Sequence, residues 1–149
     1  MRIRQEYRIE ASRRVVWDIL TRRVDDWWTH PYRVEERDSR MRLELEPHGG
    51  LVEHWADNGF AAWGRVSQLD PGITLELTGP CGMGAVHGVY TFHLQDEDGG
   101  TTLTLTHDAF GAVREEVQQT FEEAWGAMMG RLKELAEGEL AYGANARTI

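Results

Sequence analysis

Residues 113–138 read VREEVQQTFEEAWGAMMGRLKELAEG. Apolar side chains recur in this stretch at steps of three and four residues, as in Phe121, Trp125 and Met128, while glutamates gather on the opposite side. This spacing is typical of an amphipathic helix. At about 1.5 Å per residue the helix would be roughly 40 Å long, which is enough to cross a whole β-sheet.

The segments before this stretch alternate apolar and polar side chains with the period of two that is typical of half-buried strands. Residues 2–10 begin the alternation, and turn signals such as Pro47-His48-Gly49-Gly50 separate the later segments. Because the connections are short, we expect antiparallel pairing. The six further strands that the pattern predicts are Met41–Glu46, Leu51–Ala56, Phe60–Leu69, Ile73–Thr78, Val86–Gln95 and Thr101–Phe110.

Two short helices are expected between the first strand and the later ones. Ser12 can cap one helix with a single apolar stripe, and a second helical turn spans Val24–Trp28, before Pro31. The order of strand, short helices, meander and long helix predicts an α+β fold of one domain over residues 1–149, with a curved antiparallel sheet wrapped around the C-terminal helix. Where sheet and helix diverge, a space opens for side chains, water or a ligand.

The composition disfavours several classes of protein. The formal net charge is −9, from 16 basic and 25 acidic side chains, so a polyanion such as nucleic acid would be repelled. Cys81 is the only cysteine, which excludes an internal disulfide and a multi-cysteine zinc site. No run of about 18 apolar residues predicts a membrane helix, and the charged N-terminus does not resemble a signal peptide. We therefore expect a soluble, cytoplasmic protein that binds neither nucleic acid nor a membrane.

The six tryptophans are more than the core of a 149-residue chain requires. A buried indole needs a partner for its N–H group, so we expect some of these rings to line the space between sheet and helix. Ordinary filling of the core is the alternative. Trp125 lies on the apolar side of the long helix, where Met128 and Met129 would add adaptable apolar surface.

Two polar residues are candidates for the inner face of the sheet. His107 has the strand parity of Leu103, so its imidazole would point toward the helix. There it would orient a ligand carbonyl or act as an acid or base, or it would be a core histidine bonded to the backbone or to a tyrosine. Glu53 shares the parity of Leu51 and would need a partner if that face is the inner one; in the other register Glu53 is a surface residue and His54 is buried.

A glycine-rich segment, Gly79–Gly84, separates two of the predicted strands. It lacks the strand-to-helix context of a phosphate-binding loop, so we interpret it as a mobile loop beside the mouth of the space, with Cys81 and Met83 as contacts. A nucleophilic cysteine would need a neighbouring base, which the sequence does not reveal. No cofactor is expected. No metal site is expected either, because about 20 Å of extended strand separates the members of each histidine pair of equal parity, His48 with His54 and His87 with His93.

Several short motifs follow one another along nearly the whole chain: Ala11-Ser12, Val16-Trp17, Trp27-Trp28, Pro47-His48-Gly49-Gly50, Trp63-Gly64-Arg65-Val66, Asp70-Pro71, and Thr101 to His107 ending at Phe110. In this order they resemble the START-like superfamily, and within it the bacterial relatives of the activator of heat-shock protein 90 ATPase and of polyketide cyclases. The resemblance implies a helix-grip fold, in which the long C-terminal helix closes a cavity formed by the curved sheet. It implies no common catalytic motif, because the superfamily includes binding proteins, cyclases, dehydratases and co-chaperones.

Together these observations predict binding of a small, largely apolar or aromatic molecule between the sheet and the C-terminal helix. One alternative is a cyclase or dehydratase that uses His107 and Glu53 as acid and base. Another is a co-chaperone-like module, whose candidate surface is the acidic outer face of the long helix with Gly126 and Gly130; the same face would suit a homodimer. The candidate ligand-binding residues are Trp28, Glu53, Trp55, Trp63, Tyr90, His107, Phe110, Trp125, Met128 and Met129.

Overall fold

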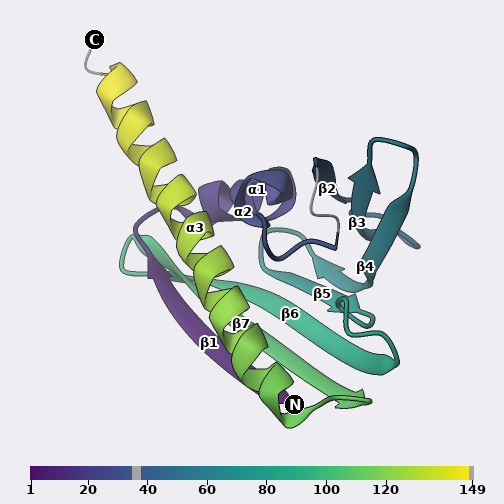
Figure 1. Ribbon diagram of the computed structural model, residues 1–149. Coiled ribbons are helices and arrows are strands. Elements are labelled where there is room, and N and C mark those ends of the chain that lie inside the picture. Colours follow the sequence, from purple (N-terminus) through teal and green to yellow (C-terminus); the bar gives the residue numbers. More distant parts are fainter. Residues whose placement is uncertain (35–37, 148–149) are drawn as a thin grey trace.

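The computed structural model describes residues 1–34 and 38–147, and the side chains among these up to residue 138. Seven strands and three helices follow one another along this part of the chain (Figure 1). In chain order they are β1 (Arg2–Ile9), α1 (Arg13–Thr21), α2 (Val24–Trp27), β2 (Ser39–Leu43), β3 (Gly50–Trp55), β4 (Phe60–Asp70), β5 (Thr74–Thr78), β6 (Val86–Glu97), β7 (Gly100–Gly111) and α3 (Glu115–Arg147).

The strands form one antiparallel sheet in the order β1-β7-β6-β5-β4-β3-β2. The sheet curls into a half-barrel, and Figure 1 shows α3 running across it, with α1 and α2 beside the middle of α3. This is the helix-grip arrangement, so the predicted α+β fold is confirmed. The seven strands lie where the period of two predicts them, although their ends differ from the predicted ones by a few residues.

The long helix extends further than the sequence suggests. We expected residues 113–138, whereas α3 begins at Glu115 and continues to Arg147. A glycine inside a helix costs only about 1 kcal/mol relative to alanine, so Gly138 weakens the helix without ending it. At the other end, Glu115 and Glu116 lie in the first turn, where their negative charges interact favourably with the helix dipole.

The first short helix forms where Ser12 predicts it. The Ser12 hydroxyl accepts the N–H of Val15 at 3.3 Å, which satisfies one of the free donors at the helix start. Val16, Ile19 and Leu20 are buried and give α1 its apolar face. The short helices α1 and α2 both contact α3, so they extend the layer that covers the sheet.

The core lies between α3 and the concave face of the sheet. Trp125 and Leu132 of α3 are completely buried, as are Leu103 and Leu105 of β7. Burial of one large apolar side chain contributes about 1.5–3 kcal/mol, so this face of α3 supplies much of the stability. The Trp125 ring lies 5.8 Å from the ring of Phe92 on β6, which fixes the height of the helix above the sheet.

Both edge strands of the sheet are partly covered by the chain itself. The N–H of Arg2 in β1 donates to the side-chain oxygen of Gln118 in α3 at 3.4 Å. The N–H of Met41 in β2 donates to Asp25 Oδ1 of α2 at 2.8 Å. An uncovered edge strand invites pairing with another chain, and each of these contacts occupies one N–H group of an edge strand.

The close approach of Tyr90 to β4 depends on Gly64. A Cβ atom at this position would lie 2.4 Å from the hydroxyl oxygen of Tyr90, whose side chain is fully buried and has no room to move. We expect Gly64→Ala to lower the free energy of unfolding by about 1–3 kcal/mol because of this overlap. The added substitution Tyr90→Phe should restore part of the loss, because it removes the overlapping oxygen.

Gly126→Ala is the matched control, because nothing lies within 4 Å of a Cβ atom at this position of α3. It should raise the free energy of unfolding by up to about 1 kcal/mol through helix propensity. Urea denaturation of the four proteins measures these differences. Equal destabilisation by both alanines would contradict the packing that we describe around Tyr90.

Candidate functional site

A pocket of about 310 Å³ opens between α3 and the residues that follow α2. We call residues 31–34 the strap. The strap forms one wall, side chains from residues 120–124 of α3 form the opposite wall, and Cys81 and Gly82 of the glycine-rich loop form the third side. The floor consists of Trp28, Trp63, Trp125 and Met128.

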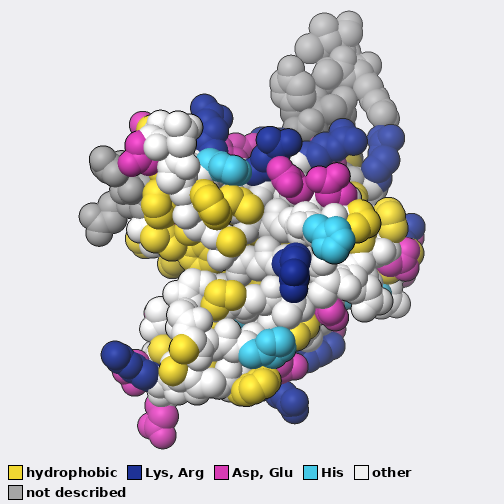
Figure 2. All heavy atoms as spheres, turned by 90° about the vertical axis from the view of Figure 1, so that its right-hand side faces the viewer, with side chains coloured by type: hydrophobic (Ala, Val, Ile, Leu, Met, Phe, Trp, Pro, Cys, Tyr) yellow, Lys and Arg dark blue, Asp and Glu magenta, His cyan; other side chains and the backbone are white. Residues whose placement is uncertain are grey.

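The face of the protein that carries β2, β3 and β4 includes an apolar region of surface (Figure 2). On the face that carries β2, β3 and β4, Figure 2 shows hydrophobic side chains gathered in one group and bordered by charged ones. Val34 of the strap is 53% exposed, which is unusual for a large apolar side chain in this protein. An exposed apolar wall beside a pocket is typical of a binding site.

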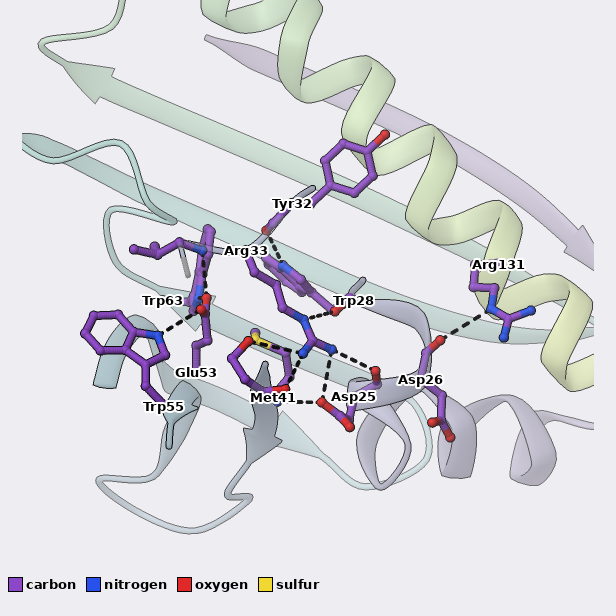
Figure 3. A network of polar contacts seen from close by, with 12 residues as sticks. Asp25, Asp26, Trp28, Tyr32, Arg33, Met41, Glu53, Trp55, Trp63 and Arg131 are labelled. Carbon is purple, nitrogen blue, oxygen red and sulfur yellow. Dashed lines mark hydrogen bonds and ion pairs between the residues drawn. The ribbon is translucent and has the colours of Figure 1, made fainter. Parts of the chain in front are cut away.

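The indole N–H of Trp63 is bonded to a buried carboxylate. Glu53 on β3 is fully buried, and its Oε1 accepts the Trp63 N–H at 3.2 Å and the backbone N–H of Val34 at 2.8 Å. Its Oε2 accepts the indole N–H of Trp55 at 2.9 Å (Figure 3). The carboxylate therefore ties the pocket floor to the strap, and these bonds offset the cost of removing it from water.

The indole N–H of Trp125 is bonded to His107. The distance from Trp125 Nε1 to His107 Nδ1 is 3.0 Å, so Nδ1 carries no proton and the neutral imidazole holds its proton on Nε2. Burial lowers the pKa of His107 to about 4, although Asp108 acts in the opposite direction. The imidazole is therefore neutral at pH 7, as an acceptor for the indole requires.

The third floor indole is bonded to the strap itself. The N–H of Trp28 donates to the backbone oxygen of Tyr32 at 2.7 Å. The Trp28 ring lies 5.0 Å from the ring of Trp63 and 5.4 Å from that of Trp125, so the three indoles form one continuous group. All three N–H groups are bonded to protein acceptors, which leaves ring carbon as the part of each indole that a ligand can contact.

The strap is held in place by Arg33, whose side chain is 6% exposed. Its Nε donates to the backbone oxygen of Trp28 at 2.6 Å, and its Nη1 reaches the backbone oxygen and hydroxyl of Ser39 at 2.7 and 3.3 Å. Its Nη2 donates to the backbone oxygen and Oδ1 of Asp25 at 2.8 and 3.0 Å (Figure 3). These contacts occupy the five N–H donors of a guanidinium group, so Arg33 lines the pocket without offering it a free donor.

The glycine-rich loop borders the pocket through Cys81 and Gly82. Cys81 lines the pocket but is otherwise buried, and burial raises the pKa of its thiol far above the usual range. Burial also raises the pKa of the neighbouring Tyr90. A protonated thiol is a poor nucleophile, so this environment does not favour covalent catalysis by Cys81. Met83 packs against the core outside the pocket lining.

The structure brings together only some of the residues that the sequence singled out. Four of them form the pocket floor, and Glu53, Tyr90, His107 and Met129 are buried outside its lining. Trp55 lines a separate surface pocket beside β2.

Phe110 does not line the pocket, contrary to the prediction from the sequence. It is 71% exposed and lies beside a different pocket, together with His87 and Met1. Successive residues of a strand point to opposite faces, so the parity that places His107 inside places Phe110 outside.

Sequence reasoning missed the strap. Tyr32 and Arg33 lie in a loop without periodicity, and their contacts are made with residues of α2, β2 and α3 that a pattern along the chain does not identify. The sequence periodicity identifies Phe121 only as part of the apolar stripe of α3, yet it lines the pocket. The adjacent aromatic and basic residues after Pro31 were the only local signal.

The described residues contain neither a group of side chains that could hold a metal ion nor a membrane-spanning helix. Within residues 1–34 and 38–147, no three His, Cys, Asp or Glu side chains are arranged to hold a metal ion. No helix in this part of the chain combines the length and the apolar character needed to cross a bilayer.

The fold and the apolar pocket under α3 define a protein of the START-like, helix-grip class. Comparison with protein families identifies the family within this class. Residues 10–137 match the family described as activator of Hsp90 ATPase homolog 1-like protein, and the chain belongs to this family. No curated protein matches the chain in sequence.

Solved structures of low sequence identity share the fold. Protein NE0264 from Nitrosomonas europaea has a TM-score of 0.69 at 18% identity, over 95% of this chain and 97% of its own. The Aha1 dimer from Colwellia psychrerythraea has a TM-score of 0.63 at 17% identity, over 92% and 96%. DynU16, a protein of the dynemicin biosynthetic locus, has a TM-score of 0.65 at 20% identity, over 89% of this chain and 46% of its own. At such identities the likeness shows the fold alone.

Glu53 can be tested by removing its acceptor oxygens. In Glu53→Leu the N–H groups of Val34, Trp55 and Trp63 lose this acceptor, and we expect the free energy of unfolding to fall by about 3 kcal/mol. Glu53→Gln keeps one acceptor oxygen and should lose less than half as much. Denaturant titration measures both values, and a Leu variant as stable as the natural protein would show that these bonds do not hold the floor.

His107 should make stability depend on pH. Its pKa falls from 6.5 to about 4 on folding, so the unfolded chain takes up a proton first as the pH is lowered. The stability present above about pH 6.5 is therefore lost progressively toward pH 4, and we expect about 2 kcal/mol of loss between pH 7 and pH 5. His107→Asn, which keeps an acceptor for the indole and does not titrate, should remove this part of the pH dependence. The control His54→Asn, at an exposed position, should retain it.

Proposed function

We propose that this protein binds a small, neutral, largely apolar molecule in the pocket between the strap and α3. The observation that supports the proposal most strongly is the arrangement of the floor indoles. Their N–H groups are bonded to Glu53, to His107 and to the backbone of the strap, so these indoles present only ring carbon to the pocket. Binding to such a floor removes apolar ligand surface from water, which favours binding by about 25 cal/mol per Å² of buried surface.

The size of the pocket supports a small ligand. A volume of about 310 Å³ lies at the lower end of the range for small-molecule sites, which runs from about 300 to 1,000 Å³. Met128 and Cys81 add polarisable sulfur to the aromatic lining, which suits a planar or aromatic molecule.

The charge distribution supports a neutral ligand. Arg33 is the one cationic side chain in the described lining, and its ion pair with Asp25, at 3.0 Å, accompanies a full set of hydrogen bonds. A bound anion would have to compete with those bonds, and the formal net charge of −9 would oppose its approach.

Acid–base catalysis by His107 and Glu53 has less support. The three floor indoles lie between these two residues. Glu53 accepts the N–H of Trp63, His107 accepts the N–H of Trp125, and the ring of Trp28 contacts both indoles. Neither residue lines the pocket, and a group that moved a proton to a ligand would have to release its indole first. The likeness to DynU16 shows the fold alone, and no side chain in the pocket favours a biosynthetic activity or a chaperone partner.

The binding proposal can be tested by filling the pocket. Ala124 lines it from α3, whereas Ala127 lies on the exposed side of the same helix. We expect Ala124→Trp to weaken binding of N-phenyl-1-naphthylamine, a neutral apolar dye, by tenfold or more, because the new ring occupies the space of the dye. The equally bulky Ala127→Trp should leave the affinity unchanged.

Fluorescence titration of the dye gives the two affinities, and circular dichroism checks that both variants are folded. If the dye binds equally well to Ala124→Trp and Ala127→Trp, it binds elsewhere and the proposal for this pocket fails.

A further inference from the structure

The hydrogen-bond donors of the pocket lining indicate which class of ligand the pocket binds. In the described lining, the side chains that can donate a hydrogen bond are three tryptophans, one arginine, one threonine, one tyrosine and one cysteine. A ligand can use only those donors that the protein has not already bonded. The inference drawn from them rests on the proposed function.

Nearly all of these donors are bonded within the protein. The indoles and Arg33 are satisfied as described above, and the Thr120 hydroxyl donates to the backbone oxygen of Glu116 at 3.1 Å. The Cys81 thiol is a weak donor, and it is buried beside Tyr90. Tyr32 is the remaining side chain, and its hydroxyl has no hydrogen-bond partner among the described residues.

The backbone and the side chain of Tyr32 have different roles. Its backbone oxygen accepts the indole N–H of Trp28, which fixes the residue against the pocket floor. Its ring rises from the strap and its hydroxyl points toward α3, away from the groups around Glu53 and Arg33 (Figure 3). The side chain is only half-buried, so the hydroxyl is accessible to a ligand held between the strap and the helix.

We propose that Tyr32 determines specificity, and that the ligand is a neutral aromatic molecule with one carbonyl oxygen, which accepts the Tyr32 hydroxyl while its rings cover the indole floor. An apolar molecule without this oxygen fits the same floor but lacks the bond. A carboxylate gains no charged partner, because Arg33 is fully bonded to Asp25, Ser39 and the backbone of Trp28.

Two probes of the same shape test the contribution of the carbonyl oxygen to binding. 2-Acetylnaphthalene carries a ketone, and 2-isopropenylnaphthalene replaces its oxygen by a methylene group. We expect the natural protein to bind the ketone about three- to tenfold more tightly in equilibrium dialysis, which is the usual net value of one hydrogen bond. Tyr32→Phe removes only the hydroxyl oxygen, so it should abolish this preference while binding the hydrocarbon as before.

The control is Tyr7→Phe, which removes a hydroxyl that donates to Gln5 on β1, outside the pocket. This variant should keep the preference for the ketone. The inference is overturned if the natural protein binds both probes equally, or if the preference survives in Tyr32→Phe. If the natural protein binds neither probe nor the naphthylamine dye, the proposed function fails as well, so the two failures are distinguishable.

Discussion

Three hydrogen bonds from indole N–H groups to buried acceptors hold the site together. The acceptors belong to three separate parts of the fold: Glu53 on β3, His107 on β7 and the backbone of Tyr32 in the strap. The rings that donate come from β4, from α3 and from the end of α2. The pocket floor therefore connects the sheet to both the long helix and the strap, and its shape depends on all of them.

The same bonds involve two ionisable residues of the core. A buried carboxylate is costly unless its oxygens are bonded, and at Glu53 two indole N–H groups and the backbone N–H of Val34 supply those bonds. His107 accepts one indole N–H at Nδ1, while its buried Nε2 has no hydrogen-bond partner among the described residues. Glu53 and His107 thereby position aromatic rings, and the pocket acquires an apolar surface although polar groups lie directly behind it. Residues whose chemistry suggests catalysis can serve in this way wherever a binding site needs aromatic rings held at fixed angles.

Much of the fold follows from periodicity in the sequence, and less of the site does. The period of two places His107 inside because each strand residue points opposite to its neighbour, and the same rule exposes Phe110. The bond between Trp125 and His107 joins residues 18 positions apart on different elements, so no local pattern reveals it. The strap was not predictable, because Arg33 and Tyr32 acquire their positions only when α2 and β2 have assembled around them.

The central claim is that a ligand meets indole carbon while the indole N–H groups stay bonded to the protein. NMR spectra of the indole groups, recorded with and without N-phenyl-1-naphthylamine, test it most directly. We expect the N–H signals of Trp28, Trp63 and Trp125 to exchange slowly with solvent and to move little, while the ring C–H signals shift on binding. Rapid exchange of these N–H protons, or large N–H shifts with unchanged ring signals, would contradict the claim.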